Sequence, residues 1–391
     1  MHNIQHGLPM ITERHNGTSK KSRQQQRLAL IDGSKIITEA LVRSGADVFV
    51  GYPITPSNLF YKYAGKRFSQ FFAAPDEITV LQWMSGFSAA GRLPVTATAF
   101  PGLALMTETL NMAYMMELPM VLIVTQRLGP STGSATTGAQ GDLAFLSGII
   151  SGGYPIPIFC PASLEDCWNL ANSSLQTAIK FRTPVVLLTS KEMIMTNRSF
   201  DVSKLKKLEK VDRSVRYFKK PYQPYQAGED MVPAFIPVGN DDYQVRLNAS
   251  THDNAGMIKK ANLESLTNTR RLKDKLEKRI GEFTFYELDD DPDADILLIS
   301  YGITGDSARD AIKTLRSQGK KVSLLIMKTL LPLAPELIRI MHRFKKLVFA
   351  EENISGQMKE LIFGRIEREH IKYVNKIGSM IAPTEIAEVF D

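Results

Sequence analysis

The chain has 391 residues, of which 43% are hydrophobic and 23% are charged, and its formal net charge is +7. This composition excludes general disorder, and the length allows two or three domains with a sizeable core. No apolar run is long and unbroken enough to span a bilayer, and the polar first 27 residues lack the apolar region of a secretory signal, so we expect no membrane partner.

Strand and helix patterns alternate from residue 28 to residue 198, after a basic tail at residues 1–27. We predict strands at residues 47–51, 95–100, 120–125, 157–160 and 185–189, and helices at 34–44, 56–67, 76–91, 103–118 and 164–181. The run at 120–125 is continuously apolar, which is typical of a strand buried on both faces. This alternation predicts a parallel, doubly wound α/β domain.

Residues 199–291 break the alternation and are predicted to form an extended connector with a basic helix over residues 257–279. The tail, residues 202–220 and residues 259–279 together carry more positive charge than the surplus of the whole chain. A nucleic-acid face is one interpretation, but no aromatic-interleaved or helix-turn-helix pattern accompanies the charge. We expect no nucleic-acid partner and interpret these segments as solvated surfaces.

A second α/β domain is predicted over residues 292–391. The patterns indicate strands at 295–300, 321–326 and 346–350 and helices at 307–318, 335–343 and 357–369. The turn Gly302–Gly305 follows a strand and precedes a helix, so it is either a phosphate-binding turn or a plain connection. The glycine fingerprints of dinucleotide and P-loop sites are absent from the sequence, which disfavours a stand-alone nucleotide-binding enzyme.

Cysteine and histidine usage limits the chemistry. Cys160 and Cys167 are too few for a four-thiolate cluster, so a redox centre belongs on another chain or on a cofactor, and a reducing, cytoplasmic location is the default. All six histidines fall outside residues 28–198. The first domain therefore cannot use a histidine triad, a histidine-ligated zinc ion or a histidine base.

Three positions near predicted strand ends carry polar side chains. Thr55 lies between two prolines just after a strand, although this segment could be a simple turn. Glu77 opens a helix of apolar and small residues, where burial would desolvate its carboxylate; the alternative is an exposed pair with Asp76 that the helix dipole favours. Arg127 follows the most apolar strand and precedes a Gly/Ser/Thr loop, so it could bind an anion or pair with a structural carboxylate.

Together these motifs resemble the α subunits of 2-oxoacid:ferredoxin oxidoreductases, which use thiamine diphosphate. The resemblance covers residue 28 to the C-terminus and is carried by Gly51–Ser57 (GYPITPS), Asp76–Ile78 (DEI), Pro101–Glu108 (PGLALMTE), Gln126–Gly133 (QRLGPSTG) and Glu351–Gln357 (EENISGQ). The GPSTG form, followed by QGDL at residues 140–143, is most similar to the 2-oxoglutarate branch, and the branched-chain enzymes are its nearest relatives.

The resemblance implies a thiamine-diphosphate pyrimidine-binding-like domain and a transketolase C-terminal-like domain. It implies that Glu77 binds and activates the cofactor, that Arg127 binds the 2-oxoacid carboxylate, and that Thr55 contacts both. Ser131 and Thr132 would line the same pocket. The implied reaction is decarboxylation of 2-oxoglutarate or a related 2-oxoacid, transfer of the acyl group to coenzyme A, and reduction of ferredoxin.

The resemblance also implies partners. Mg²⁺ and a [4Fe–4S] cluster would belong to a β subunit, and the complex would be a dimer of α–β heterodimers; no metal site is expected on this chain. The sequence departs from the family at Ala99-Phe100, where Ser-Gly is usual, and at Pro75, where an acidic residue is frequent. The ring of Phe100 leaves open the choice of oxoacid, and it also leaves open a non-catalytic interaction subunit.

Overall fold

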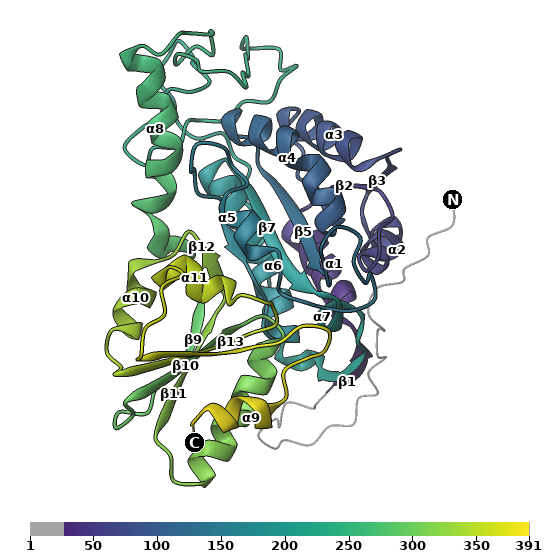
Figure 1. The fold of residues 1–391 in the computed structure, drawn as a ribbon. Coiled ribbons are helices and arrows are strands. Elements are labelled where there is room, and N and C mark those ends of the chain that lie inside the picture. Colours follow the sequence, from purple (N-terminus) through teal and green to yellow (C-terminus); the bar gives the residue numbers. More distant parts are fainter. Residues whose placement is uncertain (1–26, 391) are drawn as a thin grey trace, which may run out of the picture.

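The computed structural model describes residues 27–390, in which two large sheets are flanked by helices (Figure 1). The predicted basic tail, apart from its last residue, lies outside the described residues. Over residues 27–390, no helix is both long and apolar enough to cross a membrane.

The first sheet has seven strands in the order β12-β6-β7-β5-β4-β2-β3. All neighbouring pairs are parallel except β12 with β6. The strands are β2 (Val48–Gly51), β3 (Gln70–Ala73), β4 (Pro94–Thr98), β5 (Met120–Gln126), β6 (Ile158–Phe159), β7 (Pro184–Ser190) and β12 (Thr329–Leu331). The strand β3 was not predicted, and β12 comes from the second half of the chain.

Helices cover both faces of this sheet. They are α1 (Gly33–Ser44), α2 (Asn58–Arg67), α3 (Glu77–Ala89), α4 (Phe100–Met115), α5 (Leu143–Ser147), α6 (Leu164–Phe181) and α7 (Lys191–Met195). The helix α3 packs on α4, whereas α1 packs on α2 and α6 (Figure 1). Strand order reverses after β3, so right-handed crossovers place α3 and α4 on the face opposite α2 and α6. The predicted doubly wound α/β domain is confirmed.

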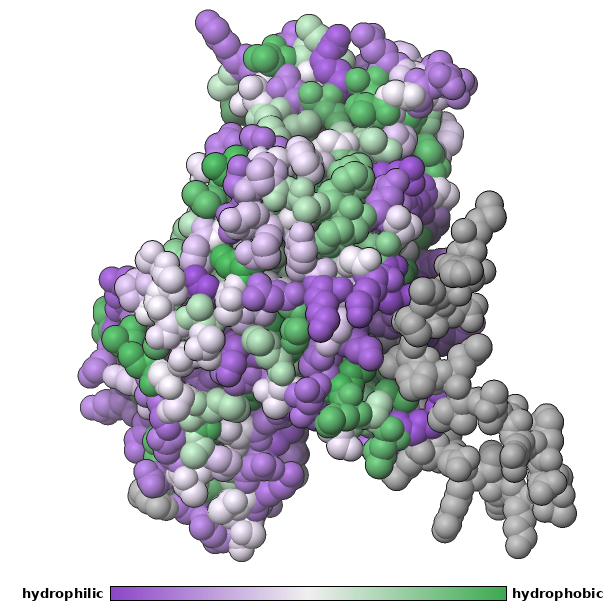
Figure 2. Space-filling model, turned by 90° about the vertical axis from the view of Figure 1, so that its right-hand side faces the viewer, coloured by the Kyte–Doolittle hydropathy of each residue, from purple (hydrophilic) through white to green (hydrophobic). Residues whose placement is uncertain are grey.

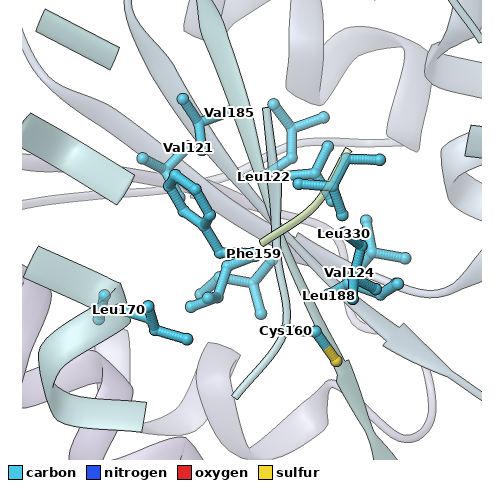
Figure 3. Packing of buried hydrophobic residues seen from close by; sticks show 14 of the residues in the cluster. Val121, Leu122, Val124, Phe159, Cys160, Leu170, Val185, Leu188 and Leu330 are labelled. Carbon is cyan, nitrogen blue, oxygen red and sulfur yellow. The ribbon is translucent and has the colours of Figure 1, made fainter. Parts of the chain in front are cut away.

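The core lies between the sheet and its helices. Every residue of β5 and β7 is buried, which explains why both strands are continuously apolar through most of their length. Val121, Val185 and Phe159 pack together in Figure 3. Cys160 and Cys167 are buried free thiols, and burial raises the pKa of both, so they behave as small apolar residues.

The second sheet has five strands in the order β14-β13-β10-β11-β9, all parallel except β9. The strands are β9 (Tyr286–Asp289), β10 (Ile296–Tyr301), β11 (Val322–Met327), β13 (Lys346–Glu351) and β14 (Ile371–Asn375); the helices are α9 (Thr304–Ser317), α10 (Pro335–Met341), α11 (Gln357–Phe363) and α12 (Pro383–Ala387). The helix α11 ends six residues earlier than the predicted 357–369 because Gly364 adopts a φ of 79° and caps it.

The segment predicted as the connector is mostly irregular and begins with a short ribbon. The strand β8 (Arg198–Asp201) pairs antiparallel with β1 (Leu28–Ile31), and a short 3₁₀ turn follows at Val202–Lys204. The helix α8 (Leu263–Glu277) starts later than the predicted residue 257 because Asn262 caps it, accepting a hydrogen bond from Ser265 N at 2.9 Å. A second 3₁₀ turn, Ile280–Phe283, leads to β9, which lies within the predicted connector yet pairs with β11.

A buried ionic cluster fastens α8 to the first domain. The Glu117 carboxylate, with no exposed surface, accepts hydrogen bonds from Lys275 Nζ at 2.7 Å and from the Arg271 guanidinium. Burial alone would raise the pKa of Glu117, but Arg271 and Lys275 hold it well below its usual range. These two basic residues of the 259–279 segment are therefore internal, in contrast to the solvated face that the sequence indicates.

The buried ionic cluster around Glu117 should contribute measurably to the free energy of unfolding. Glu117→Gln should lower the free energy of unfolding by about 3–5 kcal/mol, because it leaves Lys275 and Arg271 without their counter-charge. Urea unfolding followed by circular dichroism measures this loss. The control Asp274→Asn removes the exposed pair with Lys278 and should change stability by less than about 0.5 kcal/mol. Equal, small effects of the two substitutions would contradict the prediction.

Candidate active site

Three of the five sequence-predicted residues, together with Gly102, lie at the carboxyl edge of the first sheet. Thr55 follows β2, Glu77 opens the helix after β3, Gly102 lies in the first turn after β4, and Arg127 follows β5. The strands β3, β2, β4 and β5 are neighbours and parallel, so their carboxyl ends form one continuous edge. This edge is where open α/β sheets bind ligands.

Ser57 ties the Thr55 turn to two strand ends. Its Oγ donates a hydrogen bond to the Thr98 carbonyl at 2.8 Å and lies 3.0 Å from Thr125 Oγ1. Ser57 is only 2% exposed, so these bonds form away from competing water. Ser57 ends the GYPITPS motif, but no local pattern predicts these bonds, because their partners come from strands 41 and 68 residues away.

Arg127 is buried and held by the same turn. Its Nη1 donates to the Thr55 carbonyl at 2.5 Å, while its Nε is buried without a hydrogen-bond partner among the described residues. Burial lowers the pKa of the Arg127 guanidinium, and the nearby charge of Asp142 acts in the opposite direction. A buried guanidinium with several N–H groups unused is suited to binding an anionic group.

Glu77 is buried, which excludes the exposed first-turn alternative for this residue. Asp76 is the helix cap, accepting a hydrogen bond from Thr79 N at 2.7 Å, and Glu77 points inward with 8% of its surface exposed. A Cβ atom on Gly102 would lie only 2.9 Å from Glu77 Oε1. The Glu77 carboxylate makes no hydrogen bond or ion pair with any residue between 27 and 390, so it is available to a ligand or a partner chain.

One line of contacts joins the two charged groups. The same Cβ atom on Gly102 would lie 2.2 Å from Thr98 Oγ1, and the carbonyl of Thr98 accepts the Ser57 hydrogen bond. The Thr55 turn, to which Ser57 belongs, then holds Arg127. The structure therefore brings Glu77, Thr55 and Arg127 to a single stretch of the sheet edge.

Ser131 and Thr132 lie further out, in the loop after Arg127. The loop is closed by Ser134 N donating to the Leu128 carbonyl at 2.9 Å, and Gly133 has a φ of 47° that only glycine tolerates so close to that carbonyl. Both hydroxyl side chains are exposed, and neither hydrogen-bonds to another described residue. The chain alone does not bring them into contact with Glu77 or Arg127.

Gln140, at the end of this loop, joins the two domains. Its Nε2 donates to the Tyr301 carbonyl at 2.8 Å, and its Oε1 accepts from Glu352 N at 2.8 Å and from Thr304 Oγ1 at 3.1 Å. Gly302 approaches the Gln140 side chain so closely that a Cβ atom would lie 2.9 Å from Nε2. The Gly302–Gly305 turn is therefore filled by Gln140, in agreement with a plain connection rather than a phosphate-binding turn.

Two further features near Arg127 were not selected from the sequence as site residues. Asp142 is 6% exposed, and burial raises its pKa to about 7 against the opposing charge of Arg127. The ring of Phe100 packs edge-on against Phe145 of α5, with ring centroids 5.3 Å apart. Asp142 belongs to the QGDL motif, which by sequence alone indicates only a branch of the family.

Residues 27–390 contain no group of three or more His, Cys, Asp or Glu side chains placed to hold a metal ion.

Comparisons with known proteins find matches for both domains. Residues 39–271 match the family model described as pyruvate flavodoxin/ferredoxin oxidoreductase, thiamine diphosphate-binding, and residues 294–386 match that of pyruvate:ferredoxin oxidoreductase core domain II. The first match contains Glu77, Thr55 and Arg127, and the second contains the segment that Gln140 contacts.

Two curated relatives align over nearly their full length. The 2-oxoglutarate synthase subunit KorA of Methanocaldococcus jannaschii is 28% identical over 377 residues, covering 93% of this chain and 98% of the relative. The protein of the same name from Methanothermobacter marburgensis is 30% identical over 371 residues, covering 91% and 96%. A solved structure, the 2-oxoglutarate:ferredoxin oxidoreductase of Magnetococcus marinus with 2-oxoglutarate, coenzyme A and succinyl-CoA bound, superimposes with a TM-score of 0.88 at 24% identity, covering 97% of this chain and 68% of that one. The predicted arrangement of two α/β domains is confirmed.

The contact between Glu77 and Gly102 predicts a stability difference between two glycines. Gly102→Ala should cost about 1–3 kcal/mol, because the added methyl group overlaps Thr98 Oγ1 and the Glu77 side chain. Gly86→Ala is the matched control: it lies in α3 with no atom within 4 Å of its Cβ position and should stabilise by up to about 1 kcal/mol. Thermal unfolding of both variants checks the opposite signs, and a Gly102→Ala variant as stable as the wild type would refute the close approach.

Proposed function

The chain belongs to the pyruvate flavodoxin/ferredoxin oxidoreductase family as a 2-oxoacid:ferredoxin oxidoreductase α subunit, and we propose that its substrate is 2-oxoglutarate. The overall reaction would convert the 2-oxoacid and coenzyme A to an acyl-CoA and CO₂, with two electrons passed singly to ferredoxin. The observation that carries this proposal is the meeting of a buried, unpartnered carboxylate at Glu77 and a buried guanidinium at Arg127 on one sheet edge.

The environment of Glu77 fits the aminopyrimidine of thiamine diphosphate. A carboxylate that is 8% exposed and has no hydrogen-bond partner among residues 27–390 needs an outside donor, and a ring nitrogen supplies one. Gly102 lets the Glu77 side chain lie against its backbone, because a side chain at position 102 would overlap Glu77 and Thr98. When bound, the cofactor supplies the electron sink for decarboxylation. Glu77 would hold the proton shared with the pyrimidine nitrogen.

Arg127 and Thr55 would bind the substrate together. The Thr55 carbonyl orients the guanidinium through Nη1, which leaves the other N–H groups of the guanidinium for the 2-oxoacid carboxylate. Ser131 and Thr132 are exposed on the adjoining loop, so they would reach the substrate only when a second chain covers the loop. The Phe100–Phe145 ring pair adds an apolar wall, which bears on the choice between 2-oxoglutarate and branched-chain substrates.

A β subunit would complete the site. Ile78, Trp83 and Leu105 expose 43%, 41% and 52% of their surface on α3 and α4, beside Glu77. Figure 2 shows the side of the molecule on which α3 lies in Figure 1. Hydrophobic residues on this side lie next to hydrophilic ones. Such surface is typical of a protein interface. We assign Mg²⁺ and a [4Fe–4S] cluster to that subunit, from which ferredoxin would take the electrons. The assembly would be a dimer of α–β heterodimers. It would lie in the reducing cytoplasm, where Cys160 and Cys167 stay as thiols.

Co-expression with the β subunit tests the function directly. The purified complex should reduce a viologen dye only when a 2-oxoacid and coenzyme A are both present, with the highest kcat/KM for 2-oxoglutarate in a panel that includes pyruvate and branched-chain oxoacids. A higher kcat/KM for a branched-chain oxoacid would overturn the substrate assignment. An assembled complex that reduces no dye with any oxoacid would indicate the non-catalytic interaction subunit.

Removing the guanidinium should weaken substrate binding. Arg127→Ala should raise KM for 2-oxoglutarate by about 100-fold, since an unpaired carboxylate in a desolvated site costs about 2–5 kcal/mol. Arg127→Lys should fall between, because an ammonium group keeps the charge without the planar fork. The control Arg316→Ala removes an exposed pair with Asp289 and should leave KM unchanged. An unchanged KM for Arg127→Ala in the assembled complex would argue against this role.

Removing the charge of Glu77 should slow activation of the cofactor. In the complex, Glu77→Gln should reduce the exchange rate of the cofactor's C2 proton by about 100-fold or more, because the amide cannot share the pyrimidine proton as a carboxylate does. Quenched-flow deuterium exchange read by NMR measures this rate without turnover. Glu108→Gln alters an exposed carboxylate on α4, the helix that packs on α3, and serves as the control. A wild-type exchange rate in Glu77→Gln would exclude the proposed role.

A further inference from the structure

Asp142 is a buried carboxyl group that the proposed function leaves unused. It lies immediately before α5, is 6% exposed, and its backbone N–H donates to Gln126 Oε1 at 3.3 Å. Its side chain does not cap the helix, and its Oδ2 atom is buried without a hydrogen-bond partner among the described residues. An unpartnered carboxyl oxygen in such a position is costly unless something binds to it or it carries a proton.

Arg127 is the charge that acts on Asp142. The two side chains interact electrostatically but form no ion pair, and each keeps one buried polar atom unpartnered, Nε of Arg127 and Oδ2 of Asp142. The Nη1 atom of Arg127 is already bound to the Thr55 carbonyl. The backbone therefore fixes one end of the guanidinium. The N–H groups that are not bound there experience the charge of the Asp142 carboxyl group.

The other groups around Asp142 are neutral or directed elsewhere. Gln140 and Gln357 bind backbone groups at the contact between the domains, and Phe145 faces Phe100. The acidic residues of the adjoining second-domain turn have their own donors, Glu351 from Asn353, Met358 and Lys359 and Glu352 from Ile381. Within residues 27–390, Arg127 is thus the charged partner that distinguishes Asp142 from these two acids.

The charge of Asp142 decides what Arg127 can bind. An ionised Asp142 repels an anionic ligand of the guanidinium in a site with little water and offsets part of the attraction of Arg127 for that ligand. A neutral carboxylic acid does neither. Because burial raises the pKa of Asp142 to about 7, both forms are populated near neutral pH, although the opposing charge of Arg127 favours the ionised one.

We propose that Asp142 is a positioning residue that sets the affinity of Arg127 for the 2-oxoacid carboxylate, raising that affinity as a neutral acid and lowering it as a carboxylate. This inference rests on the proposed function, because it takes the 2-oxoacid as the ligand of Arg127. It adds a proton to the binding equilibrium: the substrate carboxylate binds with uptake of one proton by Asp142. No bond is formed or broken in this step.

The direction of the pH effect follows from linkage. The ligand binds the form of the enzyme that carries a proton on Asp142, so affinity is full below the pKa of the free enzyme and falls as the pH rises through it. With a pKa of about 7, KM for 2-oxoglutarate should rise about tenfold between pH 6 and pH 8, while kcat changes less. Bound substrate should raise the pKa of Asp142 in turn.

Two substitutions separate this role from general effects of burial. Asp142→Asn keeps the shape of the side chain but cannot ionise, so its KM should stay near the wild-type value at pH 6 across the whole range. Glu352→Gln is the matched control, because burial also raises the pKa of Glu352 to about 7 but its partner is Ile381 N rather than Arg127. Its KM should follow the wild-type pH profile.

The experiment measures KM and kcat of the α–β complex by viologen reduction at pH values from 6 to 8.5, for wild type and both variants. A pH-independent KM in Asp142→Asn alone supports the proposal. A wild-type KM profile in Asp142→Asn, or loss of the profile in Glu352→Gln, overturns it. Equal losses of kcat and kcat/KM in Asp142→Asn at every pH, with the KM profile intact, would indicate a merely structural role.

A second readout does not depend on turnover. In infrared difference spectra of the same complex, the C=O stretch of a protonated carboxyl that disappears in Asp142→Asn should titrate near neutral pH and shift to higher pH when 2-oxoglutarate is added. A titration that ignores 2-oxoglutarate overturns the inference even if the enzyme is active. A complex that is inactive with every 2-oxoacid counts against the proposed function instead, and the absence of this carboxyl band in wild type counts against Asp142 alone.

Discussion

Desolvation of charge at one edge of a parallel sheet is the constraint on which the rest of the site depends. Glu77, Arg127 and Asp142 are each less than 9% exposed, and each presents a polar group that no described residue satisfies fully. Buried charges of this kind persist only where the surrounding fold holds them and where binding offsets their cost. The fold supplies that support through backbone and hydroxyl groups, chiefly the Thr55 carbonyl and Ser57, so the charged atoms themselves stay available.

The second domain stabilises this edge from one side. The loop after Arg127 is long, and much of it is exposed. Gln140 fixes the far end of this loop to the backbones of Tyr301 and Glu352. Gln357 continues the contact by binding Gly141 and Ala144 around Asp142. The EENISGQ segment of the second domain thus supports the site indirectly, because it holds the loop after Arg127 in its shape. On another side, the Glu117 cluster fastens α8 against the first domain, so connector and sheet form one packed unit (Figure 1).

Much of the fold could be predicted because hydrophobic periodicity and the prolines and glycines that bound helices and strands are local features of the sequence. The apolar run of β5, the stripe of α6 and the proline and glycine signals indicate most strands and the longer helices of both domains, but not the short helices α5, α7 and α12. The misses share a physical cause. The strands β3, β9, β12 and β14 are short or half exposed, and β12 crosses to the other domain's sheet, so their pairing decides their state. The basic helix was interpreted as solvated because its counter-charge, Glu117, lies 154 and 158 residues away from its partners.

The sequence by itself determined the family, the two α/β domains and the candidates Glu77, Thr55 and Arg127, because the resemblance that identifies them is carried by short contiguous motifs. Tertiary structure alone decided which charges are buried, that Ser57 links the strands, that Gln140 joins the domains and that Asp142 lies beside Arg127. It also left Ser131 and Thr132 exposed on this chain. The reason is that burial and hydrogen bonding at this edge join residues dozens to hundreds of positions apart, and no local pattern records those distances.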